Sequence, residues 1–476
     1  MSAAPENGKG RYKDAKSCRR LAYDVLKKVT ADGAFANLAL KQALSGAEKR
    51  LASSVTALVY TSLENASYAD YLIAHYAKGR VHGSIRNILR IGITELLFMQ
   101  VPDHAAVNGA AELTRAVGKA GLCGFVNGVL RSIARDNAEN RLFPLPKDPA
   151  ERLSVRFGIP KGLAGEYVED YGADFAQDML SSRAHELTVR AQYPFSADAL
   201  KAELDKLDIT YTVGKYDKNA LVLDGGVNIA ELSLFKEGKL AVQSESAMLS
   251  VRACRVREGM RVLDTCAAPG GKSAYLASLM RNTGSITAWE LHEHRTELMR
   301  AALKRLGVTN CTCETRDASS AEDNGERYDA VLCDVPCSGL GGGGKPDALI
   351  RRTDESIAEL ADIQLKILLN AADLVKPGGA LVYSTCTVSR RENEDNIRRF
   401  LEKRPDFAPE SLDRLISCEH GVSCENGELN ENAGSGNAAL KEKRGRLGIQ
   451  LFPNIDGMDG FYIARMIKTE TNSKGK

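Results

Sequence analysis

The chain has 476 residues, of which 43% are hydrophobic and 26% charged, which is the composition of a globular protein. A chain of this length is too long for one ordinary hydrophobic core. No run of 18 uncharged apolar residues is present, and the opening MSAAPENGKG lacks the apolar core of a signal peptide, so we expect neither a membrane protein nor a secreted one. Eleven cysteines in such a chain indicate reduced thiols and a cytoplasmic location. Lys and Arg outnumber Asp and Glu by 21 to 13 in residues 1–150, whereas acidic residues prevail by 49 to 43 afterwards. This asymmetry favours an anionic partner for the first part, although it is also compatible with a solvated face.

The first third of the chain has a helical pattern. Apolar residues recur every three or four positions through residues 16–135, for example at Leu21 and Val25. We therefore predict an all-α bundle over residues 11–140, after a polar, disordered tail at residues 1–10. No catalytic constellation is visible in the bundle, and its His104 and Asn127 are interpreted as structural or RNA-contacting residues.

Residues 141–241 predict linker helices followed by a small α+β module. Three prolines between Leu142 and Pro149 indicate the linker. The later pattern alternates in a β-α-β-β order, with strands predicted at 187–193, 209–213 and 220–223 and a helix at 197–207. Modules of this kind often bind RNA through aromatic residues, and a structural spacer is an equally good interpretation.

From residue 242 to 468 strands and helices alternate, which predicts a Rossmann-like α/β domain built on a parallel, doubly wound sheet. The clearest helix is predicted at 354–375, closed by Lys376–Gly379. Polar or thiol residues end or follow five successive strands, and we expect them to meet at one sheet edge: Asp264, Glu290, Asp317, Asp334 and Ser384–Cys386.

The end of the chain contains a polar stretch at about 417–448, which we predict to be a flexible surface insertion, and a tail at 469–476. The insertion holds Cys418, His420 and Cys424. Three potential ligands without a regularly spaced fourth do not predict a zinc site, so we expect no metal.

The loop after the first strand of this domain indicates the cofactor. Its small residues and paired glycines let a ligand approach the backbone at a helix N-terminus: Cys266, Ala267, Ala268, Pro269, Gly270, Gly271 and Lys272. A phosphate-binding P-loop is excluded because Cys266 stands where its first glycine belongs. Glu290, 20 residues after Gly270, is suited to ribose hydroxyls, and Asp317 to an adenine amine. A nucleoside ligand without a pyrophosphate, such as S-adenosyl-L-methionine, fits this pattern.

The stretch YDAVLCDVPCSG, residues 328–339, places the carboxylate of Asp334 and the thiol of Cys337 just past a buried strand. The next strand ends at a second thiol, Cys386. One cysteine alone is more often a small buried hydrophobe than a functional group, but here two thiols and a carboxylate are expected at one edge. Lys272 is interpreted as lowering the pKa of a nearby thiol or as contacting the substrate, and the alternative is a solvated helix residue.

Several of these motifs together resemble the RNA 5-methylcytosine methyltransferases of the RsmB and Sun family. They are the loop at 266–272, DVPCSG at 334–339, YSTCT at 383–387, Arg391–Glu394 and DGFYIA at 459–464. The helical front, with NGVLR at 127–131, is similar to the NusB RNA-binding domain of RsmB-type 16S rRNA methyltransferases. The resemblance covers residues 16–465. It implies a monomeric enzyme that methylates 16S rRNA, either free or early in assembly.

The resemblance also implies roles for the two thiols, with Cys386 as the nucleophile and Cys337 assisting product release. Chemistry alone leaves the assignment reversible, because DNA cytosine methyltransferases attack with the thiol of a Pro-Cys pair. Carbon 5 of cytosine becomes nucleophilic only after a thiolate adds to carbon 6, and Asp334 is suited to protonating or orienting the ring. The alternatives are a tRNA or DNA cytosine methyltransferase and a non-catalytic RNA-binding assembly factor.

The sequence departs from the family pattern at some positions. Thr387 follows the predicted nucleophile where Ser is usual, and Val335 replaces Ala or Pro. Arg190 to Gln192 replaces an Arg-x-Asn pattern, which puts RNA contacts of that segment in doubt. Glu290 replaces the commoner Asp but still supplies a carboxylate.

Overall fold

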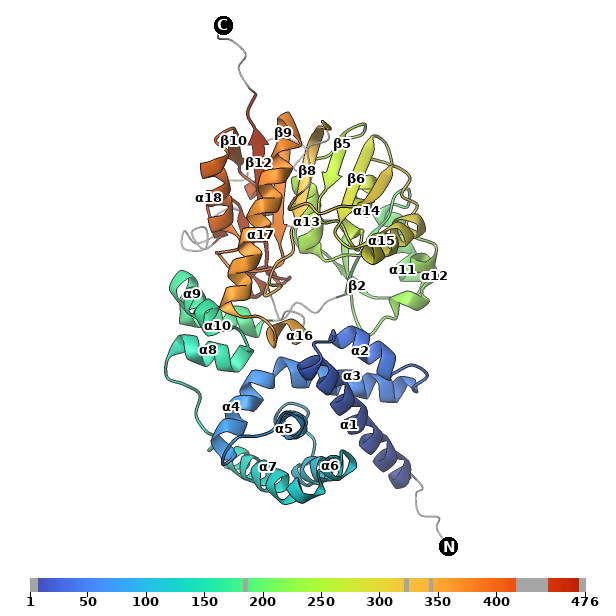
Figure 1. Ribbon diagram of the computed structural model, residues 1–476. Helices are drawn as coiled ribbons and strands as arrows, with labels where there is room; N and C mark the ends of the chain where they lie inside the picture. Colours follow the sequence, from blue (N-terminus) through green and yellow to red (C-terminus); the bar gives the residue numbers. More distant parts are fainter. Residues whose placement is uncertain (1–6, 183–186, 321–324, 342–345, 417–443, 471–476) are drawn as a thin grey trace. The chain divides into compact units, whose positions relative to one another are not determined.

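The computed structural model describes residues 7–182, 187–320, 325–341, 346–416 and 444–470 (Figure 1). The chain divides into two compact units. One comprises residues 1–173 and 344–354, and the other comprises residues 174–343 and 355–476.

The first unit is helical, as predicted. α5 is its central helix and is buried on every side, and it contacts α1, α4, α6 and α7, which surround it in Figure 1. α1 begins inside the stretch predicted as a tail. The elements are α1 (Asn7–Ala31), α2 (Ala36–Ala43), α3 (Lys49–Glu64), α4 (Ala66–Tyr76), α5 (Gly83–Leu97), α6 (Asp103–Ala116), the short η1 (Ala120–Leu122), α7 (Cys123–Ala138), α8 (Pro149–Phe157), α9 (Lys161–Tyr171) and α16 (Pro346–Leu349).

A buried ion pair links three helices of this unit. Arg19 Nε on α1 lies 2.8 Å from Glu95 Oε1 on α5, and the Arg19 guanidinium also donates to the Ala105 carbonyl on α6. A side chain at Gly109 would collide with this guanidinium, which explains the glycine. Of the two polar residues singled out in the sequence, His104 is exposed, and Asn127 is half-buried with its Oδ1 unpartnered.

The second unit begins with α10 and a small antiparallel sheet whose strand order is β2-β3-β1-β4. Tyr211 is the one aromatic residue in these four strands, so they carry no aromatic platform for RNA bases. The elements are α10 (Ala173–Ser181), β1 (Leu187–Ala191), α11 (Ala197–Lys206), β2 (Tyr211–Val213), β3 (Ala220–Leu223), η2 (Ile229–Glu231), α12 (Ser233–Lys236) and β4 (Leu240–Val242). The predicted domain boundary before residue 242 falls inside β4.

The large sheet has the strand order β10-β12-β9-β8-β5-β6-β7, and β11 pairs with β12. Strands β5 to β9 run parallel, as predicted, whereas β10, β11 and β12 add antiparallel pairs, so the sheet is mixed. Its elements are α13 (Glu245–Ala253), β5 (Arg261–Asp264), α14 (Gly271–Leu279), β6 (Ser285–Glu290), α15 (Glu293–Arg305), β7 (Cys311–Thr315), β8 (Tyr328–Asp334), α17 (Asp354–Asp373), β9 (Val375–Thr385), α18 (Glu394–Lys403), β10 (Phe407–Glu410), α19 (Asp413–Ile416), β11 (Ile449–Leu451), α21 (Pro453–Asp456) and β12 (Phe461–Lys468).

Both faces of this sheet are covered by helices, because apolar residues point alternately to either side. Val262 and Leu332 pack with α13 and α14 on one face. Leu263 and Val331 pack with α17 and α18 on the other, where α17 crosses the sheet in Figure 1. The prediction for residues 374–379 was wrong, since α17 ends at Asp373 and β9 already begins at Val375, next to a bulge in its pairing with β8.

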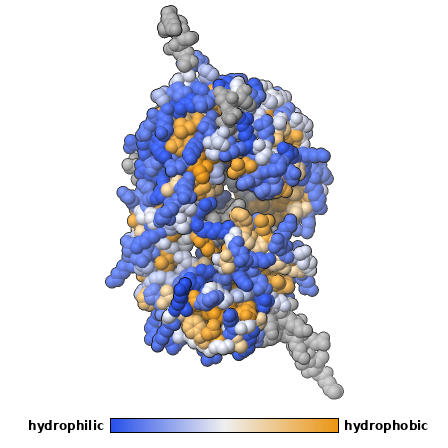
Figure 2. Space-filling view, viewed as in Figure 1, coloured by the Kyte–Doolittle hydropathy of each residue, from blue (hydrophilic) through white to orange (hydrophobic). Residues whose placement is uncertain are grey.

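On the face shown in Figure 2 hydrophilic residues predominate, and apolar residues form small separate patches. Within the described ranges, no helix has both the length and the apolar character needed to cross a bilayer. The predicted insertion at 417–448, with its Cys418, His420 and Cys424, falls outside the described residues up to residue 443.

Candidate functional site

The strand order brings the predicted site residues to one edge of the large sheet. β8 lies between β5 and β9, and Asp334 at the end of β8 is in register with Ser384 near the end of β9. The chain winds outward from β5 through β6 to β7 and then returns to the other side of β5. This reversal creates a crevice position between β5 and β8, where open α/β sheets bind ligands.

Two thiols meet just past the ends of β8 and β9. Cys337 Sγ lies 3.2 Å from Cys386 Sγ, and Cys386 is the exposed member of the pair. The hydrogen bond from the Cys337 thiol lowers the pKa of Cys386, and the ammonium of Lys272 acts in the same direction. The same contact and burial raise the pKa of Cys337 well above its ordinary value. The geometry therefore favours a Cys386 thiolate beside a protonated Cys337.

A lysine and a carboxylate form an ion pair beside these thiols. Lys272 Nζ lies 2.7 Å from Asp334 Oδ2, and Ser384 Oγ donates to Asp334 Oδ1 at 2.7 Å. Both charged side chains are mostly buried, with 18% of Lys272 and 25% of Asp334 exposed. Burial works to lower the pKa of Lys272, but the charges of Asp334 and Asp264 outweigh it and raise that pKa. Lys272 is therefore a charged and fixed group, not a solvated helix residue.

The loop before α14 has the open backbone that the sequence predicts. Gly270 adopts a φ of +100°, and its N–H donates to the Ala267 carbonyl at 2.7 Å. The loop is tied to the next strand because the Ala267 N–H donates to the carbonyl of Trp289. A side chain built at Gly271, the first residue of α14, would meet nothing within 4 Å. The N-terminus of α14 is thus accessible to a ligand.

The carboxylates assigned to the nucleoside lie on the two neighbouring strands. Glu290, the last residue of β6, is buried and accepts hydrogen bonds from the N–H of His292 and the guanidinium of Arg295. Asp317 follows β7 and is exposed, and hydrogen bonds from Ser319 and Ser320 lower its pKa. Glu290 pairs in register with Thr315, two residues before Asp317.

Sequence reasoning missed one carboxylate at this edge as a site residue. Asp264 ends β5 and is fully buried, and its Oδ2 accepts from the Ser273 hydroxyl at 2.7 Å. Among the residues that the structure describes, its Oδ1 has no hydrogen-bond partner, and burial raises its pKa to about 6. Its position after a strand, like that of Asp334, was the available signal. An unpartnered acceptor under an open glycine loop fits a cationic nucleoside such as S-adenosyl-L-methionine.

Cys266 is the predicted loop residue that does not fit a chemical role. Burial raises its pKa well above the ordinary range, so this sulfur stays a thiol and packs partly into the core. No cluster of metal-ligating side chains occurs among the residues that the structure describes.

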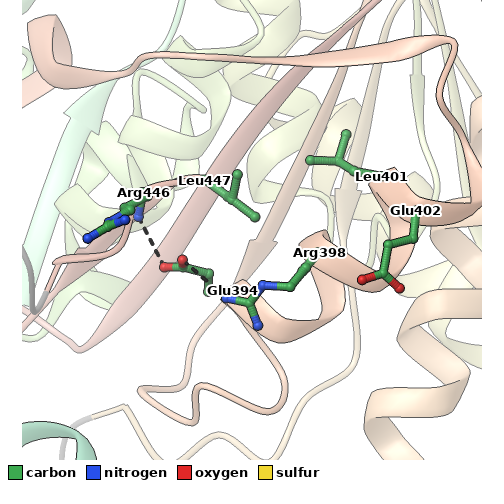
Figure 3. A pocket seen from close by; sticks show the side chains of 6 residues that line it. All are labelled: Glu394, Arg398, Leu401, Glu402, Arg446 and Leu447. Atoms are coloured by element: carbon green, nitrogen blue, oxygen red, sulfur yellow. Dashed lines mark hydrogen bonds and ion pairs between the residues drawn. The ribbon is translucent and has the colours of Figure 1, made fainter.

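A hollow on α18 is separate from this edge. Figure 3 shows it lined by Glu394, Arg398, Leu401, Glu402, Arg446 and Leu447. The Arg446 N–H donates to Glu394, and Arg398 lies 3.6 Å from the same carboxylate. None of the predicted site residues lines it, so we place the site at the edge of the sheet.

Comparison with known proteins supports the predicted family. The profile described as "16S rRNA methyltransferase RsmB/F" matches residues 252–467, and that of the NusB family matches residues 16–135. A Bacillus subtilis protein described as "Probable ribosomal RNA small subunit methyltransferase B" is 34% identical over 95% of this chain and 99% of its own length. A Shewanella oneidensis protein named "Ribosomal RNA small subunit methyltransferase B" is 31% identical over 81% of this chain and 82% of its own.

A solved structure of a methyltransferase homologue from Pyrococcus horikoshii is 28% identical to this chain. It has a TM-score of 0.55 and covers 68% of this chain and 100% of its own. The family expectation and the NusB-like front are therefore confirmed. The chain belongs to the RsmB family of S-adenosyl-L-methionine-dependent rRNA methyltransferases, with a NusB domain ahead of the catalytic domain.

Proposed function

We propose that this protein transfers a methyl group from S-adenosyl-L-methionine to carbon 5 of a cytosine in 16S rRNA, through a covalent bond between Cys386 and the base. The observation that carries the proposal is the thiol pair of Cys337 and Cys386, 3.2 Å apart and next to the ion pair of Lys272 with Asp334. Methyl transfer to a nitrogen or an oxygen needs no thiol, whereas carbon 5 of cytosine needs one.

The first step assigned to the chain is nucleophilic attack. The Cys386 thiolate adds to carbon 6, and electron density moves through the ring to carbon 5 and nitrogen 3. The hydrogen bond from Cys337, which lowers the pKa of Cys386, supports this role because the thiolate, not the thiol, is the nucleophile. When bound, S-adenosyl-L-methionine would supply the electrophilic methyl group to carbon 5 and would leave as S-adenosyl-L-homocysteine.

The neighbouring groups handle the protons. Asp334 is held by Lys272 and Ser384, so it can orient the base, and its ion pair with Lys272 is a proton source for nitrogen 3. After methyl transfer a base must remove the proton from carbon 5 so that the Cys386–carbon 6 bond breaks and the thiolate leaves. We assign assistance of this release to Cys337, 3.2 Å from Cys386: its S–H can hydrogen-bond to the departing Cys386 sulfur, while solvent water takes up the carbon 5 proton.

The substrate has to present an unstacked cytosine, because Cys386 cannot reach carbon 6 inside a helix. We therefore propose loops of free or early-assembly 16S rRNA as substrate, bound by a monomer in the cytoplasm. The NusB domain would supply phosphate contacts, in line with the excess of Lys and Arg in residues 1–150.

The test is labelled methyl transfer to protein-free 16S rRNA by the wild type, Cys386→Ala and Cys337→Ala, with nucleoside analysis for 5-methylcytidine. Denaturing gels detect protein attached to RNA. We expect Cys386→Ala to lose activity and form no adduct, and Cys337→Ala to accumulate one. An adduct that instead appears when Cys386 is removed would make Cys337 the attacking thiol.

The same assay on tRNA and duplex DNA distinguishes the alternative functions. Activity confined to tRNA or to duplex DNA would replace the proposed substrate. If the wild type methylates none of these nucleic acids but binds 16S rRNA, the protein is an RNA-binding assembly factor that retains the cofactor fold.

A further inference from the structure

A buried polar cluster lies beneath the two thiols, and we call it the Glu392 cluster. Its members come from the turn before α18, from α17 and from the two thiol loops, and each is at most 1% exposed. They are Ser338, Gln364, Thr387, Glu392 and Asn393. The proposed chemistry uses none of these side chains.

The cluster holds the residues on both sides of Cys337. The Ser338 N–H donates to Glu392 Oε1 at 2.8 Å, and Ser338 Oγ donates to Glu392 Oε2 at 2.6 Å. On the other side, Gln364 Nε2 donates to the Pro336 carbonyl at 2.9 Å and also to Glu392 Oε1 at 2.9 Å. Glu392 therefore fixes the Cys337 loop directly and again through Gln364.

The cluster holds the residues on both sides of Cys386 as well. Thr385 Oγ1 donates to Asn393 Oδ1 at 2.5 Å, and Asn393 Nδ2 donates to the Thr387 carbonyl at 2.9 Å. Thr387 Oγ1 lies 3.0 Å from Ser338 Oγ, which joins the two thiol loops. Consecutive residues, Glu392 and Asn393, thus anchor one loop each.

The buried carboxylate of Glu392 holds the groups that donate to it in fixed positions. Its three donors compensate for the loss of water. Without it the Ser338 N–H would lose its acceptor, and Gln364 Nε2 would keep only its hydrogen bond to Pro336. The thiols themselves cannot fix their spacing, because Cys386 is exposed and an S–H group is a weak donor.

We propose that Glu392 is a positioning residue that sets the spacing between the Cys337 and Cys386 thiols. This inference rests on the proposed function, because the spacing matters for catalysis only if both thiols act on one base. Glu392 sets the geometry by accepting hydrogen bonds, and its charge adds to the raised pKa of Cys337 as a smaller contribution than the contact with Cys386 and burial. Glutamine retains an acceptor for the Ser338 N–H, and its amide can donate to Ser338 Oγ.

The test measures alkylation of Cys386 by iodoacetamide as a function of pH, resolved by peptide mass spectrometry and without RNA. In Glu392→Ala the Cys337 loop loses its anchor and the thiol contact to Cys386 weakens. We expect the alkylation midpoint to rise by about one pH unit, which makes the reaction at pH 7 about tenfold slower. Glu392→Gln should stay within about twofold of the wild type. So should the control Asp395→Asn, whose half-buried carboxylate pairs with Arg390 and Arg398 and not with the thiol loops.

A second comparison separates positioning from a general loss of structure. In a Cys337→Ala background the substitution Glu392→Ala should leave Cys386 alkylation unchanged, because its effect passes through Cys337. If Glu392→Ala does not fold, Ser338→Ala removes the 2.6 Å hydrogen bond and should shift the midpoint in the same direction.

Three results would overturn the proposal: a wild-type midpoint in folded Glu392→Ala, an equal shift in the Cys337→Ala background, or a Glu392→Gln variant as slow as Glu392→Ala. Failure of the proposed function is distinguishable. A wild type that methylates no RNA but shows the expected alkylation shifts would remove the function and leave the positioning role.

Discussion

The edge of the large sheet that carries the two thiols and the small antiparallel sheet each bury a basic side chain. The two side chains differ in the number and kind of their hydrogen-bond partners. Arg190 on β1 is fully buried, and its guanidinium donates to Gln243, Gln192 and the Gly271 carbonyl while lying 4.6 Å from the ring of Tyr275. Lys272, next to Gly271, has one ion pair and keeps part of its surface open. A basic group saturated by neutral acceptors serves the fold, whereas one with free donors can serve chemistry.

This comparison also settles the role of the segment from Arg190 to Gln192. Burial lowers the pKa of Arg190 to about 10, so it stays charged at neutral pH, but it is turned inward and not toward RNA. Because Gly271 begins α14, the arginine links the small sheet to the cofactor loop.

The largest effect on the free energy of unfolding is expected from replacing the fully hydrogen-bonded Arg190. Arg190→Met should cost about 3–5 kcal/mol of unfolding free energy, because four acceptors lose their donor, among them the buried side chains of Gln192 and Gln243. Denaturant unfolding measures this loss, with Arg281→Met on the exposed ion pair to Glu258 as control, expected within about 0.5 kcal/mol. A loss in Arg190→Met as small as in the control would contradict the structural role.

Substitution of the partly exposed Lys272 should affect methyl transfer more than stability. Lys272→Met should lower the rate of methyl transfer at saturating substrates about 100-fold, or ~2.7 kcal/mol. Because it leaves the mostly buried Asp334 without its ion pair, it should also lower thermal stability, but by less than Arg190→Met does. It should also raise the pH midpoint of Cys386 alkylation, because the lysine charge favours the thiolate. Lys304→Met, an exposed change on α15, is the control. An unchanged rate of methyl transfer in Lys272→Met would show that Lys272 has only a structural role.

A smaller effect is expected at the carboxylate of Asp264, whose Oδ1 is unpaired within the described ranges. Asp264→Asn should weaken S-adenosyl-L-methionine binding about tenfold at pH 7.5, measured by calorimetry. The pKa of Asp264 in the free protein is about 6, and a cationic ligand favours the ionised form. Wild-type affinity should therefore fall as the pH drops through about 6, and the variant should lose this dependence. Asp329→Asn, at the opposite end of β8, should retain it.

The smallest effect is expected at the hollow on α18 in Figure 3. Glu394→Gln removes a carboxylate that contacts Arg398 and the Arg446 N–H near the surface. We expect a change in stability of at most about 0.5 kcal/mol and unchanged methyl transfer. A loss of activity with intact stability would show that this hollow belongs to the functional site.

Many of the residues at the edge that carries the two thiols could be predicted, because the end of a strand is indicated by a few neighbouring residues in the sequence. Short apolar runs before Asp334 and Ser384 indicated two strands, and both residues do end or nearly end β8 and β9. The start of β9 could not be predicted in the same way. Lys376 to Gly379 has the composition of a helix stop and turn, yet Val375 before it and Ala380 after it both pair with β8, so the segment becomes an irregularity within the strand.

The sequence by itself determined which chemical groups the chain carries and at which strand ends they occur, because turn residues and apolar periodicity act over a few positions. Only the tertiary structure decided which groups meet. Cys337 and Cys386 are 49 residues apart, and their 3.2 Å contact follows from the adjacency of β8 and β9. The inward positions of Arg190 and Glu392 likewise depend on packing between distant segments, since burial and hydrogen-bond satisfaction are properties of the assembled fold.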